Sequence, residues 1–381
     1  MPSLLSPPRP HGPASPSRAP PLEEPAGFGK GLGPWLRGAT RDAGRGTLST
    51  YPPRNLPPAT LGLTRKGVKE MLKEVQEVKV GGRTRRVHVR PFAWNLHAPT
   101  HMEWTPDGRL LVVERTTGKV KDVTKGGDME EAKPFAWGLQ GPSSMCPLPD
   151  GRILITEFWG GRIRDISVGG PSEKLAIYAE DLSKPYSLAL DALGRLLVTE
   201  HLGHGVGRIS ILASGKAVPL VQGVPSVETP GFEGYTPPHA WPDRWEGFVA
   251  GCGKWGTDPK VFPDRPYVFA VSIGGLGLIV GVPEDGGHYE ALAPEHTFAR
   301  GLGWTGGMIA HPFDGMLYVT QPLQGEIRAI NPRESRNYRF DPPVVSGIPM
   351  ASCVRFTPDG EKMLVCSPQS GAIWQVEGFS D

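Results

Sequence analysis

The sequence lacks the features that mark several common protein classes. Only four of its 381 residues are cysteines and no CxxC pair occurs, which argues against a structural zinc site. No apolar run is long enough to span a bilayer, and the N-terminal region has no continuous hydrophobic stretch of the secretory-signal kind. The formal net charge is only +2, so no nucleic acid or membrane partner is expected. These absences favour a cytoplasmic protein with a small-molecule substrate and leave the oligomeric state open.

Motifs of several enzyme mechanisms are also missing. There is no GxSxG elbow, no glycine-rich phosphate loop followed by Lys and Ser or Thr, and no HExxH. Cys252 has no histidine that can be positioned beside it, which disfavours a thiol nucleophile. Cys353 and Cys366 fall opposite each other about the Asp359-Gly360 turn, where two reduced thiols are expected rather than a strained disulfide.

The N-terminal part differs from the rest of the chain. The first 60 residues hold 14 of the 42 prolines and show no apolar periodicity, so residues 1–63 are predicted to be disordered. An organelle-targeting peptide, or a start codon assigned too far upstream with Met71 as the true start, would both explain such an extension. Residues 64–85 are predicted to form a short helix and a linker, and 86–92 the first strand.

A strand–turn–strand phrase returns about every 43 residues and dominates the remaining sequence. It reads THMEWTPDGRLLVVER at 100–115, SSMCPLPDGRILITEF at 143–158, YSLALDALGRLLVTEH at 186–201, MIAHPFDGMLYVTQP at 308–322 and SCVRFTPDGEKMLVCSP at 352–368. An Asp-Gly pair between two apolar strands favours a tight hairpin. The repeat predicts an all-β fold, a six-bladed β-propeller over 86–381, with a divergent fourth blade and an insertion at 223–246. The last blade lacks a fourth strand, which the 86–92 strand is expected to supply, closing the ring.

Polar side chains are expected to gather at one end of the central channel, where the inner strands begin and the second strands end. We call this end the mouth. Reflecting each hairpin about its turn places Glu114 opposite His101. The same operation places Glu157 opposite Ser144, Glu200 opposite Ser187, and Gln321 opposite Met308.

Carboxylates and imidazoles around a concave mouth are typical of a divalent-metal or small-ligand site. The candidate metal ligands are Glu114, Glu157 and Glu200, and the candidate catalytic bases are His101 and His201. The candidate substrate-binding residues are Ser144, Ser187, Trp159, His204, His239, Trp241 and Gln321. A structural role for the glutamates is the alternative, because they recur at one position of the repeat.

The repeat phrases resemble a six-bladed superfamily that includes NHL-repeat proteins, gluconolactonase-like calcium lactonases and soluble glucose/sorbosone dehydrogenases. The first blade, with Trp104 and the run Glu114 to Val120, looks most like that of the dehydrogenases, and the TE-x-x-G and GRI phrases look like streptogramin B lyase repeats. The lactonase and lyase resemblances imply calcium or magnesium; the dehydrogenase resemblance implies pyrroloquinoline quinone (PQQ) with calcium. The dehydrogenase HxxGRL segment is absent, and only Asn95 among four asparagines lies near the mouth.

Three functional hypotheses follow. The first is a divalent-metal-supported hydrolase or lyase that acts on a lactone, a sugar or a related small polar molecule. The second is a PQQ-dependent sugar dehydrogenase. The third is a non-catalytic propeller that binds a ligand or a protein partner.

Overall fold

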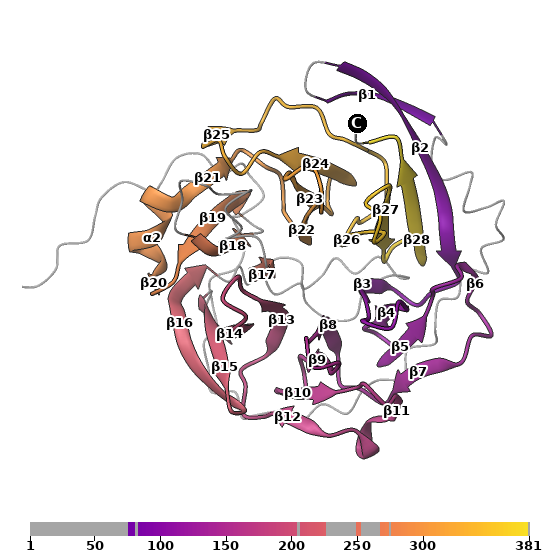
Figure 1. The fold of residues 1–381 in the computed structure, drawn as a ribbon, viewed down its shortest axis with the longest axis vertical. Helices are drawn as coiled ribbons and strands as arrows, with labels where there is room; N and C mark the ends of the chain where they lie inside the picture. The colour runs from indigo at the N-terminus through magenta and orange to yellow at the C-terminus, as the bar shows by residue number, and fades with distance from the viewer. Residues whose placement is uncertain are drawn as a thin grey trace, which may run out of the picture. The chain divides into compact units, whose positions relative to one another are not determined.

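The computed structural model describes residues 75–80, 83–203, 206–225, 249–252, 267–273 and 276–379, which all belong to the compact unit 57–381. Six β-sheets are arranged around a central axis (Figure 1). The six-bladed propeller predicted from the repeat is therefore confirmed. The predicted extension 1–63 lies outside the described residues, as does most of the insertion.

Each blade begins with an inner strand and proceeds outward. The inner strands are β3 (Pro99–Trp104), β8 (Pro142–Pro147), β13 (Pro185–Leu190), β17 (Val249–Cys252), β22 (Met308–Ala310) and β26 (Cys353–Phe356). The second strands are β4 (Leu110–Glu114), β9 (Ile153–Glu157), β14 (Leu196–Gly203), β18 (Tyr267–Ile273), β23 (Leu317–Gln321) and β27 (Lys362–Ser367). The third strands are β5 (Lys119–Asp122), β10 (Arg162–Asp165), β15 (Val206–Ala213), β19 (Leu278–Pro283), β24 (Glu326–Ile330) and β28 (Ala372–Glu377).

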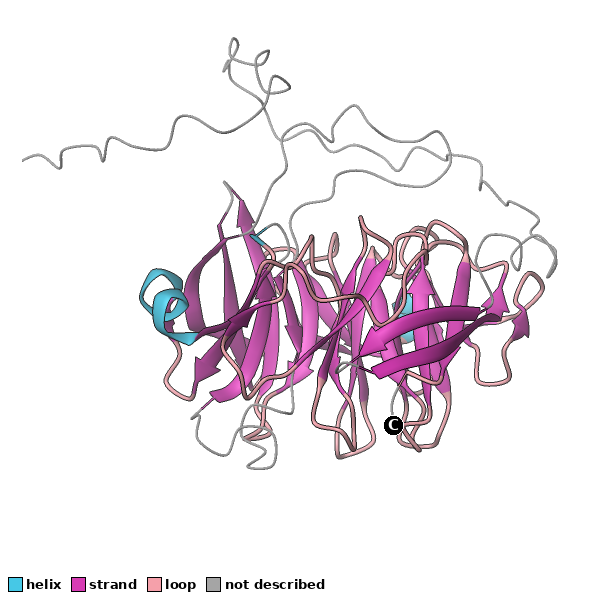
Figure 2. Ribbon diagram, turned by 90° about the horizontal axis from the view of Figure 1, so that it is seen from above, coloured by secondary structure: helices cyan, strands magenta, loops and turns pink. Residues whose placement is uncertain are grey.

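The outer strands complete the sheets and connect the blades. They are β7 (Pro134–Trp137), β12 (Ile177–Ala179), β16 (Lys216–Pro225) and β21 (Thr297–Arg300). Two-residue strands from the following blade add parallel pairing at four outer edges: β6 (Gly127–Asp128), β11 (Gly170–Pro171), β20 (Gly287–His288) and β25 (Arg336–Asn337). Helix α2 (Tyr289–His296) and the short 3-10 helix η2 (Ser172–Lys174) lie in connections between strands (Figure 2).

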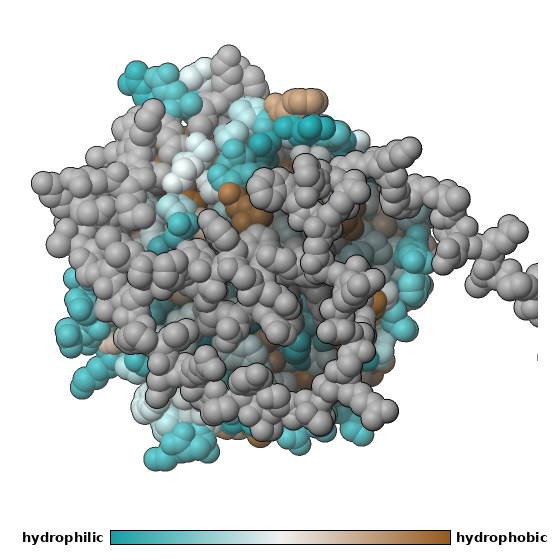
Figure 3. All heavy atoms as spheres, turned by 180° about the vertical axis from the view of Figure 1, so that it is seen from behind, coloured by the Kyte–Doolittle hydropathy of each residue, from teal (hydrophilic) through white to brown (hydrophobic). Residues whose placement is uncertain are grey.

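Apolar residues fill the spaces between blades, which is why the second strands have little polar character. All five residues of β4, β9 and β23 are buried, because blades pack on both faces of each of these strands. The side chains at the periphery of the face seen in Figure 3 are mostly hydrophilic, with scattered hydrophobic ones. No helix among the described residues is long and apolar enough to cross a membrane.

The last blade is completed from the N-terminal side of the propeller, as predicted. Strand β2 (Arg83–Trp94) pairs antiparallel with β28, with Val89 opposite Val376, and its end pairs with β6 of the first blade. The short helix and linker predicted over 64–85 are wrong for the later part of that range, because β1 (Val75–Val80) is a strand paired with β2. Residues 64–74 lie outside the described part of the chain. Pairing with an existing strand edge outweighed a weak helical pattern in β1.

The predicted hairpin register is wrong in the first three blades. Their regular pairing is displaced from it by one residue, and a β-bulge near the mouth displaces it by a second. The glutamates lie opposite prolines: Glu114 opposite Pro99, Glu157 opposite Pro142, and Glu200 opposite Pro185. In blade 5 Met308 lies opposite Val319 instead of Gln321. Proline lacks a backbone N–H and is confined to strand starts and bulges, so the three prolines mark the position where regular pairing ends.

Candidate functional site

The three predicted metal ligands occupy one repeated structural position. Glu114, Glu157 and Glu200 each have 0% of their surface exposed. Each accepts a hydrogen bond from the backbone N–H of the residue 17 positions earlier, in the segment that enters the blade. The donors are His97 at 2.9 Å, Gln140 at 2.7 Å and Ser183 at 3.1 Å. The carboxylates therefore fasten the entrance of each blade to the end of its second strand.

A basic residue of the third strand also pairs with each carboxylate. The ion pairs are Lys121 Nζ to Glu114 Oε1 at 3.4 Å, Arg164 Nε to Glu157 Oε2 at 2.7 Å, and Arg208 Nε to Glu200 Oε2 at 2.7 Å. For Glu200, burial alone would raise the pKa, but hydrogen bonds from Arg208 and Ser210 outweigh burial and lower it.

These partners bear directly on the predicted metal site. Within the described ranges, no group of three or more His, Cys, Asp or Glu side chains is arranged to hold a metal ion. A carboxylate that already has a cation and a backbone donor does not fit a shared divalent ion, because the ion would need the same oxygens. The metal role of Glu114, Glu157 and Glu200 stays a prediction, and their observed contacts favour the structural alternative.

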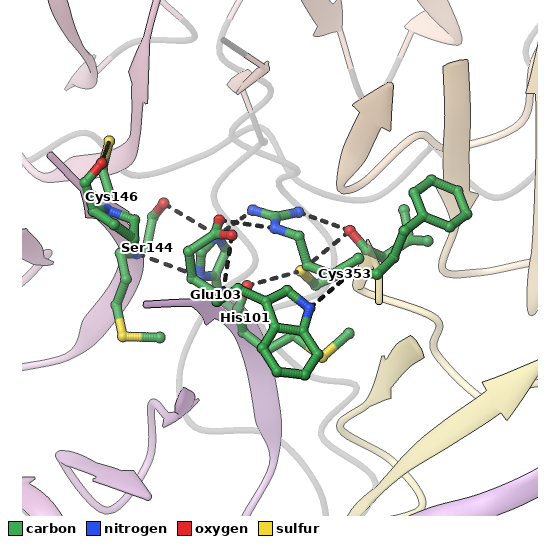
Figure 4. A network of polar contacts seen from close by, with 12 residues as sticks. His101, Glu103, Ser144, Cys146 and Cys353 are labelled. Carbon is green, nitrogen blue, oxygen red and sulfur yellow. Dashed lines mark hydrogen bonds and ion pairs between the residues drawn. The ribbon is translucent and has the colours of Figure 1, made fainter. Parts of the chain in front are cut away.

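A different polar cluster, the channel network, consists of His101, Glu103, Ser144 and Arg355 on the inner strands β3, β8 and β26. Arg355 Nε donates to Glu103 Oε2 at 2.8 Å, and Arg355 Nη2 lies 3.0 Å from His101 Nε2. Ser144 Oγ lies 3.4 Å from the same His101 nitrogen. Figure 4 shows His101, Glu103 and Ser144 grouped beside Cys353. The network thus joins three blades around the central axis.

The channel network keeps the His101 ring neutral. Its Nε2 faces the Arg355 guanidinium, and its Nδ1 lies 3.3 Å from the backbone N–H of Met145. Since donors face both ring nitrogens, an additional proton would be repelled at either one. Burial, and then the charge of Arg355, hold the pKa of His101 well below its usual value. His101 is therefore uncharged at neutral pH.

A second cluster, the mouth cluster, consists of Arg115, Phe158, Trp159, Tyr186 and His201. The Arg115 guanidinium carbon lies 4.6 Å from the Phe158 ring centre and 5.5 Å from those of Trp159 and Tyr186. Phe158 and Tyr186 also make edge-on contacts with His201. Burial raises the pKa of Tyr186, so its phenol stays protonated. Trp159, predicted to bind substrate, is 50% exposed, whereas His201 is only 3% exposed.

Several buried polar atoms at the mouth have no hydrogen-bond partner among the residues that the structure describes. They are Asn95 Oδ1, Thr100 Oγ1, Trp304 Nε1, Thr305 Oγ1 and Gln321 Nε2. Thr305 is 0% and Gln321 1% exposed. Gln321 replaces the repeated glutamate, and its Oε1 accepts from Arg328 Nε at 3.1 Å, leaving the amide N–H groups unpaired. Buried polar groups are nearly always paired, by protein or by something bound, so this rim of blade 5 has unused hydrogen-bonding capacity.

The remaining predicted residues fare differently. Ser144 Oγ accepts from the backbone N–H of Leu188 at 3.2 Å, which links blades 2 and 3. Ser187 lies at the equivalent position of blade 3, where its backbone N–H donates to Thr199 Oγ1 at 2.9 Å. His204, His239 and Trp241 lie outside the described residues.

Sequence reasoning did not identify Glu103 and Arg355 as site residues. A signal existed, because they occupy the same repeat position with opposite charge in the two blades that meet at the ring closure. The second and third blades have Cys146 and Ala189 there.

No family model matches the sequence, and no curated protein matches it. Solved structures do match in fold. A luciferin-regenerating enzyme is 13% identical, with 77% of this chain and 95% of that chain covered at a TM-score of 0.54. A gluconolactonase from Xanthomonas campestris is 9% identical, with 81% and 95% covered at a TM-score of 0.51. These likenesses agree with the predicted superfamily resemblance at the level of the fold, which is what such identities can show.

Proposed function

We propose that the protein is an enzyme of the hydrolase or lyase type. Its substrate is a small polar molecule, a lactone, a sugar or a related compound, which reacts at the mouth and in the channel of the propeller. The observation that carries this proposal is the neutral His101 imidazole held 3.0 Å from the Arg355 guanidinium. A base beside a fixed positive charge suits a reaction in which a proton is removed while negative charge develops on a neighbouring oxygen. The fold neighbours that are named as a gluconolactonase and a luciferin-regenerating enzyme are consistent with a small-molecule reaction.

For a lactone, His101 would take a proton from the water that attacks the ring carbonyl. Arg355 would donate hydrogen bonds to the oxyanion that forms, with Glu103 fixing the guanidinium through the 2.8 Å bond. The unpaired donors of Trp304 and Gln321 at the rim of blade 5 would bind the oxygen atoms of the substrate.

A divalent ion is part of the broader lactonase-type hypothesis and would polarise the carbonyl if bound. Because Glu114, Glu157 and Glu200 do not fit a shared ion, the proposed steps use His101 and Arg355 alone. Elemental analysis of the purified protein, with and without added calcium, tests whether a metal is held elsewhere in the chain.

The test is hydrolysis of glucono-1,5-lactone and a panel of aliphatic lactones, followed by acid release. We expect His101→Gln to lower kcat/KM by about 100-fold or more, in the range lost with a general base. His88→Gln is the matched control, because His88 is exposed on β2 and should leave the rate unchanged. The proposal fails if His101→Gln keeps wild-type turnover, or if the wild-type protein turns over no lactone or sugar substrate.

The pH dependence gives a second readout. Because the pKa of His101 lies well below its usual value, kcat/KM should fall on acidification only well below pH about 6.5. Arg355→Lys keeps a positive charge but loses the planar fork, and is expected to lower the rate while retaining some activity. A rate that titrates near the ordinary histidine pKa would contradict the assignment of His101 as the base.

A further inference from the structure

Blade 6 brings two cysteines together that the proposed reaction does not use. Cys353 on β26 and Cys366 on β27 are direct partners in the antiparallel pair, and both are free thiols. They are buried, with 1% and 0% of their surface exposed. Residues directly opposite each other project from the same face of the sheet, with Cβ atoms about 4.5–5.5 Å apart.

That spacing lies close to the geometry of a disulfide. Opposite Cα atoms in an antiparallel pair are about 4.5–5.5 Å apart, and disulfides span Cα separations of about 4.4–6.8 Å. In a disulfide the two Cβ atoms are about 3.8 Å apart. Formation of a bond between Cys353 and Cys366 therefore requires their Cβ atoms to approach by roughly 1 Å.

The two thiols differ in their surroundings. Cys353 Sγ lies 3.9 Å from the backbone carbonyl of Met102 in blade 1, and Arg355 follows two residues later on the same strand. Burial acts to raise the pKa of Cys353, but the contact with Cys366 and the charge of Arg355 outweigh burial and lower it. Burial and the neighbouring Cys353 raise the pKa of Cys366. One thiol is thus suited to attack and the other to resolve.

We propose that Cys353 and Cys366 form a redox-active dithiol that a small hydroperoxide converts into a disulfide. The Cys353 thiolate attacks one peroxide oxygen, the O–O bond breaks, and hydroxide leaves and is protonated by solvent. The sulfur of Cys366 then attacks the resulting sulfenic acid; the S–O bond breaks, and the departing hydroxide takes the Cys366 proton as water. Two thiols and one hydrogen peroxide give one disulfide and two waters. Burial of both sulfurs restricts the oxidant to a small molecule.

The experiment uses the full-length protein with a small excess of hydrogen peroxide, followed by alkylation and trypsin digestion without reductant. Cleavage after Arg339, Arg355 and Lys362 places the two cysteines on separate peptides, 340–355 and 363–381. Mass spectrometry should find these peptides joined, with a loss of two hydrogen atoms, and dithiothreitol should separate them. Cys146 is the internal control, because the residue directly opposite it on the neighbouring strand is Leu154 and not a cysteine.

Two variants sharpen the test. Cys366→Ser should stop at the sulfenic acid, which dimedone traps on Cys353, and Cys146→Ser should leave the joined peptides unchanged. The proposal is overturned if the wild-type protein gives no joined peptides, or if Cys146 is oxidised as readily as Cys353. Peptide mapping of the wild-type protein decides the question by itself, so the test does not depend on whether the variants fold. The outcome is independent of the proposed lactone or sugar reaction.

Discussion

The contacts of Glu157 make a sharp prediction about its role. In Glu157→Gln the side chain keeps its shape but loses its charge, while Arg164, with 11% of its side chain exposed, remains in place. Three contacts are weakened: the hydrogen bonds from Arg164 Nε at 2.7 Å and from the backbone N–H of Gln140 at 2.7 Å, and the ion pair with Arg162 Nε at 3.2 Å. Hydrogen bonds to charged groups contribute about 1.5–3 kcal/mol each, and removing one partner of a buried ion pair costs about 3–5 kcal/mol. We expect the free energy of unfolding to fall by about 3–5 kcal/mol.

Urea unfolding followed by tryptophan fluorescence measures this loss. Glu77→Gln is the control, because Glu77 pairs with Arg86 at the surface, with side chains 65% and 76% exposed, and its loss should change stability little. The double variant Glu157→Gln with Arg164→Met should recover part of the loss, since the more deeply buried of the two arginines that pair with Glu157 is then no longer left without its carboxylate. The structural interpretation is refuted if Glu157→Gln is as stable as the wild type but loses calcium binding measured by calorimetry.

Three further predictions concern pH and backbone geometry. Because the pKa of Glu200 is lowered in the folded state, its contribution to stability is present above the pKa of the unfolded state and is lost as pH falls through the folded pKa. The free energy of unfolding should therefore fall less steeply with acidification in Glu200→Gln than in the wild type. Equal slopes would contradict this. Burial acts to lower the pKa of His311, but hydrogen bonds with Asp314 and the Gly360 carbonyl outweigh burial and raise that pKa. The contribution of His311 to stability is therefore complete below pH about 6.5 and is lost as pH rises through the folded pKa. If His311→Gln shows the same dependence of stability on pH between pH 6 and 8 as the wild type, this assignment is wrong. Gly118 has a φ of +65°, and an added Cβ would lie 2.3 Å from the Leu139 carbonyl oxygen. In Gly118→Ala the free energy of unfolding measured in urea should therefore fall by more than about 1 kcal/mol. Gly108→Ala is the control and should cost less, because nothing lies within 4 Å of the added Cβ.

The repeat predicted the architecture because every blade solves the same packing problem with the same phrase. Apolar strands around an Asp-Gly turn fix the hairpins locally, so the strands and the closure by β2 could be read from the chain. The mouth could not be read in the same way. Reflection about the turn already misplaces the regular pairs of these hairpins by one residue. A one-residue bulge beside Pro99, Pro142 and Pro185 adds a second shift, and hairpin symmetry contains no information about bulges.

The channel network was missed for a related reason. Glu103 and Arg355 are 252 residues apart, and their ion pair exists only because the first and last blades become neighbours when the ring closes. Repeat alignment compares equivalent positions but does not ask which blades touch. The glutamates of the repeat, in contrast, were open to a structural interpretation from the outset because they recur, and their ion pairs within each blade favour it.

The seam between β2 and β28 governs how the molecule can assemble. During synthesis β2 emerges early, yet its partner strand lies almost 300 residues downstream, as the Arg90–Glu377 ion pair with a separation of 287 residues illustrates. Until β28 has been made, the edge of β2 that pairs with it has no partner, and an open strand edge is a surface on which chains adhere to one another. We expect ring closure to come late in folding, because the seam joins segments that are far apart in the chain.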